Sequence, residues 1–186
     1  MTNLKRVFAV VIVMTLALSS CKKEDPIIPN EEELITTLKY TLTPNGGGAA
    51  VVLSFKDLDG DGGNAPIIIG GTLVSNKTYT GVLVLLNEQE TPAENITTEI
   101  KEEDKNHQFF FQTNITGLTV AYSDQDADGN PLGLESTLTT TGAGNGTLTI
   151  TLRHEPNKSA TGVANGDITN AGGETDIEVT FDIIVQ

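Results

Sequence analysis

The sequence has one cysteine, two histidines and 11 basic residues against 25 acidic ones. One cysteine cannot form a disulfide within the chain, and two histidines are fewer than the three or four ligands of a zinc site. The net charge of −14 disfavours nucleic acid and anionic membrane surfaces as partners, and favours cations or basic surfaces. The longest apolar run, residues 7–18, is too short to cross a bilayer, which needs about 20 residues.

Motifs of common enzymes are also missing. The chain has no Gly-x-Ser-x-Gly, and the glycine-rich run 142–146 does not complete a dinucleotide loop. His154-Glu155 is followed by Pro156 and lacks the second histidine of a zincin helix. Acid pairs are frequent, but a glycosidase needs two carboxylates at a set separation that the sequence does not specify. The sequence therefore predicts a non-catalytic protein.

The N-terminus has the layout of a secretory signal peptide. Lys5 and Arg6 precede the apolar run, and small residues follow it. Leu18-Ser19-Ser20-Cys21 resembles the bacterial lipobox, in which the cysteine is acylated and becomes the first residue of the mature protein. A lone cysteine in an exported chain fits this use, and several acyl chains, at about 0.8 kcal/mol per buried CH₂, make an effectively permanent anchor. We expect residues 1–20 to be a signal peptide and Cys21 to carry palmitate or a related lipid.

Residues 21–33 predict a flexible acidic tether after the lipidated cysteine. Lys22-Lys23-Glu24-Asp25 resembles the signal by which some Gram-negative bacteria place lipoproteins on the outer face of the cell, and a plain charged linker has the same composition. The expected location is the outer membrane, on its periplasmic face or at the cell surface. Loss of residues 1–20 removes Lys5 and Arg6 and no acid, which changes the net charge from −14 to −16.

Residues 34–186 predict one all-β domain, because apolar residues recur with a period of two and turn residues separate the runs. We expect a single antiparallel β-sandwich of the immunoglobulin-like or Greek-key kind, with about eight strands. Three hairpins are predicted, pairing residues 35–43 with 48–55, 107–113 with 117–123, and 135–141 with 147–154. Residues 79–87 are apolar on both faces and predict a central strand, and residues 176–185 predict a final strand. One short helix is expected, capped by Thr91, with Pro92 first, and ending near Asp104.

Five segments carry a resemblance to a family of small bacterial lipoproteins: residues 57–63, 78–88, 107–111, 152–158 and 172–176. Its members are labelled "type 1 periplasmic binding fold superfamily protein". That label implies two lobes of alternating strands and helices around parallel sheets. The chain has one plausible helix and about half the length that such a fold requires, so we expect the all-β sandwich instead.

Residues 124–135 fit the calcium-loop pattern D-x-[DN]-x-[DN]-G-x₅-E. Alternate carboxylates converge on a hard cation, the glycine permits the turn and the last Glu closes the shell. The predicted calcium ligands are Asp124, Asp126, Asp128, Asn130 and Glu135. The alternative is an acidic loop of Asx turns without a metal.

The first half of the calcium pattern recurs at Asp57, Asp59 and Asp61. Ile68 occupies the position of the closing Glu, so this second site would be incomplete.

The two histidines are candidate ligands of a transition metal, a weaker possibility than calcium. The predicted hairpins place His107 near Ser123 and Asp124, and His154 near Glu135. Alternation puts both imidazoles on the core-facing side of their strands, at the mouth of the sandwich. The alternative is two strand-end histidines, each bonded to a neighbour.

Two functions follow from the sequence. The first is a non-catalytic lipoprotein at the outer membrane that presents the loop and both histidines to a cation, a small solute or a partner transporter. The second is a surface structural or adhesion module that calcium stabilises. They differ in one observation, since only in the first does substitution of His107 and His154 change binding.

Overall fold

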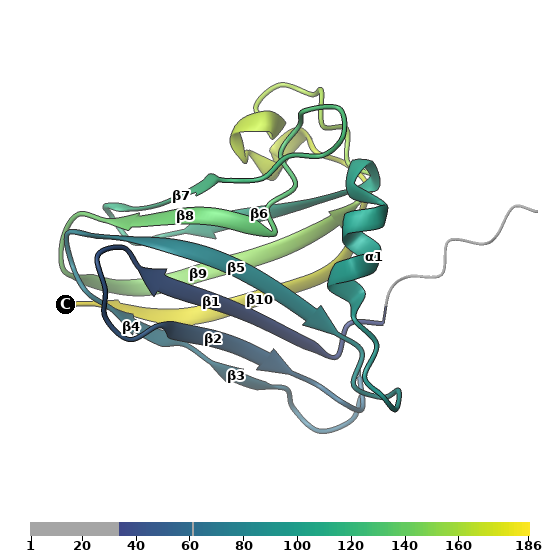
Figure 1. The fold of residues 1–186 in the computed structure, drawn as a ribbon, viewed down its shortest axis with the longest axis horizontal. Helices are drawn as coiled ribbons and strands as arrows, with labels where there is room; N and C mark the ends of the chain where they lie inside the picture. Colours follow the sequence, from purple (N-terminus) through teal and green to yellow (C-terminus); the bar gives the residue numbers. More distant parts are fainter. Residues whose placement is uncertain (1–33, 61) are drawn as a thin grey trace, which may run out of the picture. The chain divides into compact units, whose positions relative to one another are not determined.

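The computed structural model describes residues 34–60 and 62–186, which form two β-sheets (Figure 1). Sheet A has the strand order β3-β2-β1-β5-β8-β7, and sheet B has the order β4-β10-β9-β6. All neighbouring strands are antiparallel except β4 and β10, which are parallel. The strands are β1 (Thr37–Pro44), β2 (Val51–Lys56), β3 (Ile67–Ile69), β4 (Gly71–Leu73), β5 (Lys77–Leu86), β6 (His107–Thr113), β7 (Leu118–Tyr122), β8 (Glu135–Thr140), β9 (Gly144–His154) and β10 (Glu174–Val185).

The predicted all-β sandwich with one short helix is confirmed, with ten strands in the described residues rather than about eight. The predicted signal peptide, Cys21 and the tether lie outside the described residues, and so does Asp61. Residues 34–60 and 62–186 do not have the alternating strands and helices around parallel sheets that the periplasmic-binding label implies.

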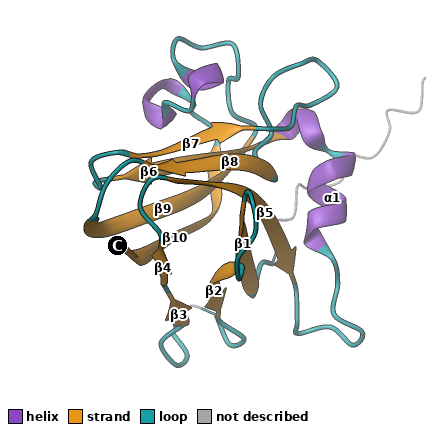
Figure 2. Ribbon diagram, turned by 60° about the vertical axis from the view of Figure 1, so that its left-hand side comes forward, coloured by secondary structure: helices purple, strands orange, loops and turns teal. Residues whose placement is uncertain are grey.

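The core lies between the two sheets (Figure 2) and follows the alternation of the strands. Each fully buried Leu or Ile contributes about 1.5–3 kcal/mol relative to an exposed one. Fully buried members include Leu38, Leu42, Leu85, Leu138, Leu148, Ile150, Leu152 and Phe181. A second, small cluster lies on the outer side of β6, where Phe110 packs against Val163 and Ala171 of the segment 155–173.

Two predictions of strand arrangement are confirmed. β1 and β2 pair as a hairpin, with Tyr40 opposite Leu53. β5 is central in sheet A, between β1 and β8. The final strand β10 also buries alternate side chains, as predicted.

The other two predicted hairpins are wrong. β6 lies in sheet B and pairs with β9, whereas β7 lies in sheet A and pairs with β8. The same holds for β8 and β9, which belong to different sheets. Both short turns cross from one sheet to the other, so the apolar side chains of the connected strands face each other across the core. Apolar residues alternate with the same period of two in a hairpin and in such a crossing, so the sequence pattern does not distinguish the two arrangements.

The predicted helix begins later than expected. α1 spans Ile96–Glu102 and is followed by a 3₁₀ turn, Asp104–Asn106. Asn87 and Glu94 exchange backbone hydrogen bonds of 3.1 and 3.0 Å, so Glu94 is held as a bridge partner and Thr91 and Pro92 remain in the loop.

α1 lies at one end of the sandwich (Figure 1). Its Ile96 and Ile100 are buried in the main core, and the Thr97 hydroxyl bonds to the backbone of Leu85 in β5. The 3₁₀ turn after α1 leads into His107 at the start of β6, opposite the end of β9. We call this end, with α1, His107 and His154, the α1 pole. None of the helices in the described part of the chain is both long and apolar enough to cross a membrane.

Candidate functional site

The two histidines lie side by side at the α1 pole. His107 of β6 is the register partner of His154 of β9, and their ring centroids are 4.6 Å apart. Both are buried, on the strand faces that carry Phe109 and Leu152 into the core, as alternation predicts. The predicted strand partners are wrong: His107 pairs with His154 in sheet B, while Glu135 lies in sheet A opposite Val82.

Asp176 is the third member of this group. The register between β9 and β10 shifts between Thr175 and Ile177, so Asp176 is the extra residue of a β-bulge. The bulge turns its carboxylate inward, and the side chain is 1% exposed. Asp176 Oδ1 lies 3.7 Å from His154 Nδ1, and Oδ2 lies 3.9 Å from His107 Nε2. One ligand atom from each of the three side chains lies within 4.8 Å of the others.

The backbone fixes the tautomer of His107. Its Nδ1 is 3.1 Å from the carbonyl oxygen of Glu103, which can only accept a hydrogen bond, so Nδ1 carries the proton. Burial lowers the pKa of His107, the bond to Glu103 partly opposes this, and the charge of nearby His154 lowers the pKa further. The other ring nitrogen, Nε2, faces the Asp176 carboxylate.

The predicted calcium loop, residues 124–135, connects β7 to β8 within sheet A. The Asp124 carboxylate accepts hydrogen bonds from the backbone amides of Gly133 and Glu135, at 2.7 and 2.9 Å. Asp126 Oδ1 accepts from the amides of Asp128 and Asn130, at 2.9 and 2.8 Å. These carboxylates therefore close the loop on itself through Asx-type turns.

A lysine ammonium lies against the same loop. Lys158 Nζ is 2.8 Å from Asp126 Oδ2 and also donates to the carbonyl oxygens of Asp104 and Pro131. The two side chains are 6% and 1% exposed, so this ion pair is buried. Burial raises the pKa of Asp126, but the hydrogen bond from Lys158, the amide of Asn130 and the lysine charge outweigh it and hold the pKa below its usual value.

Asn130 Nδ2 donates to the Asp126 carboxylate, whereas Asp128 and Glu135 point away from it. Asp128 pairs with Lys105 at 2.9 Å on the surface, and Glu135 is exposed. Among the described residues, the group close enough to share one ion consists of His107, His154 and Asp176, and no acid of this loop belongs to it. Calcium at residues 124–135 stays a prediction, and the hydrogen bonds favour the other alternative, the acidic turn.

The second acidic loop also forms local turns. Asp57 Oδ1 accepts from the amides of Asp59 and Gly60, and Asp59 Oδ2 accepts from the amide of Asn64 at 2.9 Å. A shallow hollow of about 260 Å³ lies here, lined by Lys56, Asp57, Leu58, Asp59, Asn64, Ala65 and Ile67.

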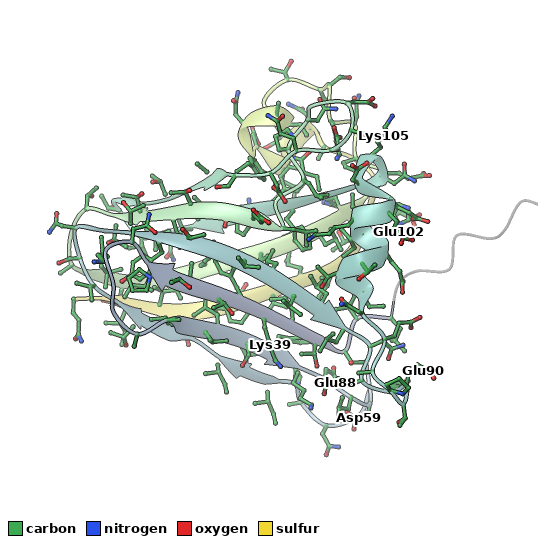
Figure 3. The ribbon with its side chains drawn as sticks, viewed as in Figure 1. Lys39, Asp59, Glu88, Glu90, Glu102 and Lys105 are labelled. Atoms are coloured by element: carbon green, nitrogen blue, oxygen red, sulfur yellow. The ribbon has the colours of Figure 1, made fainter. Side chains whose placement is uncertain are left out.

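The edge of sheet A beside this hollow is apolar. β3 is the outermost strand, and its three isoleucines, Ile67, Ile68 and Ile69, are 63%, 45% and 54% exposed. Edge strands of soluble proteins are usually protected by charge, proline or a covering segment. Asp59, Glu88 and Glu90 lie near one end of this edge (Figure 3).

Comparisons with known proteins do not identify a family. No family model matches the chain, and no curated protein matches it. Among solved structures, the chain is similar to domains 4 and 5 of the S-layer protein SbsC, with 14% identity, 78% of this chain and 75% of that chain covered, and a TM-score of 0.32. A likeness this distant carries no conclusion about function. The resemblance to small bacterial lipoproteins stays a prediction.

The sequence motifs did not include Asp176 or Lys158 among the site residues. Asp176 directly precedes the alternating residues of β10, and strict alternation with Ile177 would point it to solvent. Lys158 belongs to an irregular segment 32 residues from its partner Asp126. Two signals were available in the sequence. Asp176 is an acid next to a core strand, and Lys158 is a lysine in a chain with few basic residues.

Proposed function

We propose that this chain is a lipid-anchored, non-catalytic module at the outer membrane that binds an extended segment of a partner protein along β3. The observation that carries the proposal is the run of three exposed isoleucines on an edge strand. An exposed apolar edge offers unpaired backbone groups for strand addition and side chains for apolar contact. A partner transporter of the same membrane is one candidate.

The proposal of a lipid anchor is based on the sequence. The lipobox-like Leu18-Ser19-Ser20-Cys21 follows a complete secretory signal, and an acidic tether separates it from the domain. A tethered domain meets membrane partners at a high effective concentration, so a short edge strand can suffice for binding.

The acids around the edge favour a basic partner. Asp57 and Asp59 line the hollow next to Ile67, and the whole chain has a net charge of −14. A second copy of the same chain would bring like charges together, which disfavours self-pairing. A segment with alternating apolar and basic side chains would complement both the exposed isoleucines of β3 and the acids beside them.

Fluorescence polarisation with synthetic peptides tests this proposal. A labelled ten-residue peptide of alternating Val and Lys should bind the intact chain at physiological salt, and a Val and Glu peptide should not. Ile67→Ser with Ile69→Ser should weaken binding about tenfold or more, because both apolar contacts are lost, which corresponds to about 1.4 kcal/mol.

The matched control is Val82→Ser, which removes an exposed apolar side chain from the central strand β5 and should leave binding unchanged. Equal binding by the double isoleucine variant would refute the proposal. A dimer that disappears in that variant would also refute it, because a second copy would then occupy the edge.

A further inference from the structure

We propose that His107, His154 and Asp176 together bind one divalent transition-metal ion, which joins β6, β9 and β10 at the α1 pole. This inference is independent of the partner site at β3, which lies on other strands. The third ligand, Asp176, does not belong to any metal-binding motif in the sequence.

The distances between the donors suit one shared ion. Two donors bound to a zinc-sized ion at about 2.0–2.1 Å with tetrahedral angles lie about 3.4 Å apart. The observed separations are 3.7 Å between Asp176 Oδ1 and His154 Nδ1, and 3.9 Å between Asp176 Oδ2 and His107 Nε2. These two distances involve different oxygens of the Asp176 carboxylate. When one oxygen is taken with one nitrogen of each histidine, the three donor atoms lie within 4.8 Å of one another, so side-chain movements of about 1 Å would bring three ligands onto one ion, with a water molecule as the fourth.

The surroundings of His107 match those of a metal ligand. A ligating histidine usually donates its other ring N–H to a carbonyl or carboxylate, which fixes the tautomer and the ring. Here Nδ1 donates to the Glu103 carbonyl oxygen at the junction of α1 and the following 3₁₀ turn. The bulge at Asp176 has the corresponding role in β10, because it turns the carboxylate toward both imidazoles.

The types of donor atom indicate which class of metal would bind. Two imidazole nitrogens and one carboxylate oxygen suit zinc, cobalt, nickel, copper or ferrous iron. Calcium requires six to eight oxygen ligands, which these three side chains do not offer. The side chains are 0%, 5% and 1% exposed, so no substrate reaches the ion directly and its role is to stabilise the pole.

The surface next to the pole carries more acids than bases. A hollow of about 450 Å³ lies over the segment that leads into β6, and it is lined by Glu102, Glu103, Asp104, Lys105, Asn106 and Ala127. Figure 3 shows Glu102 and Lys105 at this end. The buried cation Lys158 is already paired with Asp126, so its charge is largely compensated.

Because the chain contains two histidines, its histidine NMR signals report on the site directly. The intact chain, purified in detergent and freed of metal with a chelator, is titrated with zinc and, separately, with cobalt as an absorbing probe. We expect one ion per chain, new cobalt absorption in the visible range, and slow-exchange shifts of the ¹⁵N signals of both histidines. Calcium at millimolar concentration should leave these signals unchanged.

Three variants separate a metal site from a buried pair of histidines. Asp176→Asn keeps the shape of the side chain, and His154→Gln replaces the imidazole with a neutral polar side chain. Both should weaken zinc binding at least tenfold, with circular dichroism confirming the fold. Asp182→Asn, an exposed acid of the same strand, should bind as the unaltered chain does. Absence of stoichiometric zinc or cobalt binding by the unaltered chain overturns the proposal. So do unshifted histidine signals, or equal affinity in folded Asp176→Asn and His154→Gln.

Discussion

Asp126 and Asp128 stand two positions apart in one loop, yet each pairs with a lysine in a different environment. Asp126 and Lys158 are buried, whereas the side chains of Asp128 and Lys105 are 60% and 54% exposed. Removing one partner of a buried pair leaves an uncompensated charge, while a surface pair contributes little. The two pairs therefore form a natural test of the role of Lys158.

Lys158→Met should lower the free energy of unfolding by about 3–5 kcal/mol, because the Asp126 carboxylate would stay buried without its cation. Lys105→Met, the matched control, should change it by less than about 1 kcal/mol. Urea unfolding of the intact chain measures both. A loss in Lys158→Met no larger than in the control would show that the lysine does not hold the loop.

The same pair predicts a dependence on pH. The pKa of Asp126 is lowered in the folded state, so its contribution is present above the unfolded value of about 3.9 and is lost as pH falls through the folded pKa. In Lys158→Met the burial of Asp126 is no longer opposed by the lysine, so the pKa of its carboxyl in the folded state should rise and the loss of stability with acid should become smaller or disappear. Thermal unfolding between pH 7 and 3 compares the two. Identical pH profiles would contradict this explanation.

At the residue scale, sequence reasoning identified His107 and His154 and the side of the strand on which they lie. It missed Asp176, because a single extra residue in β10 reverses the direction that alternation assigns. It also missed Lys158, because a contact between residues 126 and 158 depends on how irregular segments fold and not on periodicity.

At the scale of elements, predictions of strand pairing were correct where a turn forms a hairpin and wrong where it crosses between the sheets. The β1–β2 hairpin, the central β5 and the final β10 were predictable from apolar alternation and turn residues. The crossings from β6 to β7 and from β8 to β9 were not, because their turns carry the glycines and polar residues of hairpins. The loop 124–135 joins two strands of sheet A while both histidines belong to sheet B. The loop still contacts the α1 pole, because the amide of Ala127 donates to the Asp104 carboxylate and the amide of Phe109 donates to the carbonyl oxygen of Leu132.

One crossing has a clear requirement for glycine. Between β3 of sheet A and β4 of sheet B, a Cβ on Gly70 would lie 2.0 Å from the carbonyl oxygen of Asp182. Gly70→Ala should therefore destabilise the domain by about 1–3 kcal/mol, as overpacking does. Gly142→Ala is the control, because nothing lies within 4 Å of its Cβ position. Equal midpoints of thermal unfolding in the two variants would exclude a close crossing at Gly70.

At the scale of the whole molecule, we propose a lipid anchor at the N-terminus, followed by a β-sandwich with an apolar edge at β3 and a buried polar group at the α1 pole. The prediction that concerns the anchor is that the native host incorporates labelled palmitate into the chain and that Cys21→Ala abolishes both the label and membrane partitioning. Ser20→Ala, which keeps a small residue before the cysteine, should retain both. Label in the Cys21→Ala variant would refute lipidation at this residue.

The central claim is that the α1 pole is organised around His107, His154 and Asp176, with Lys158 as the cation of the neighbouring acidic loop. The most direct measurement is elemental analysis of the intact chain purified from its native host without a chelator. The account predicts about one transition-metal ion per chain and calcium far below one. Stoichiometric calcium without a transition metal, or no bound metal at all, would contradict it.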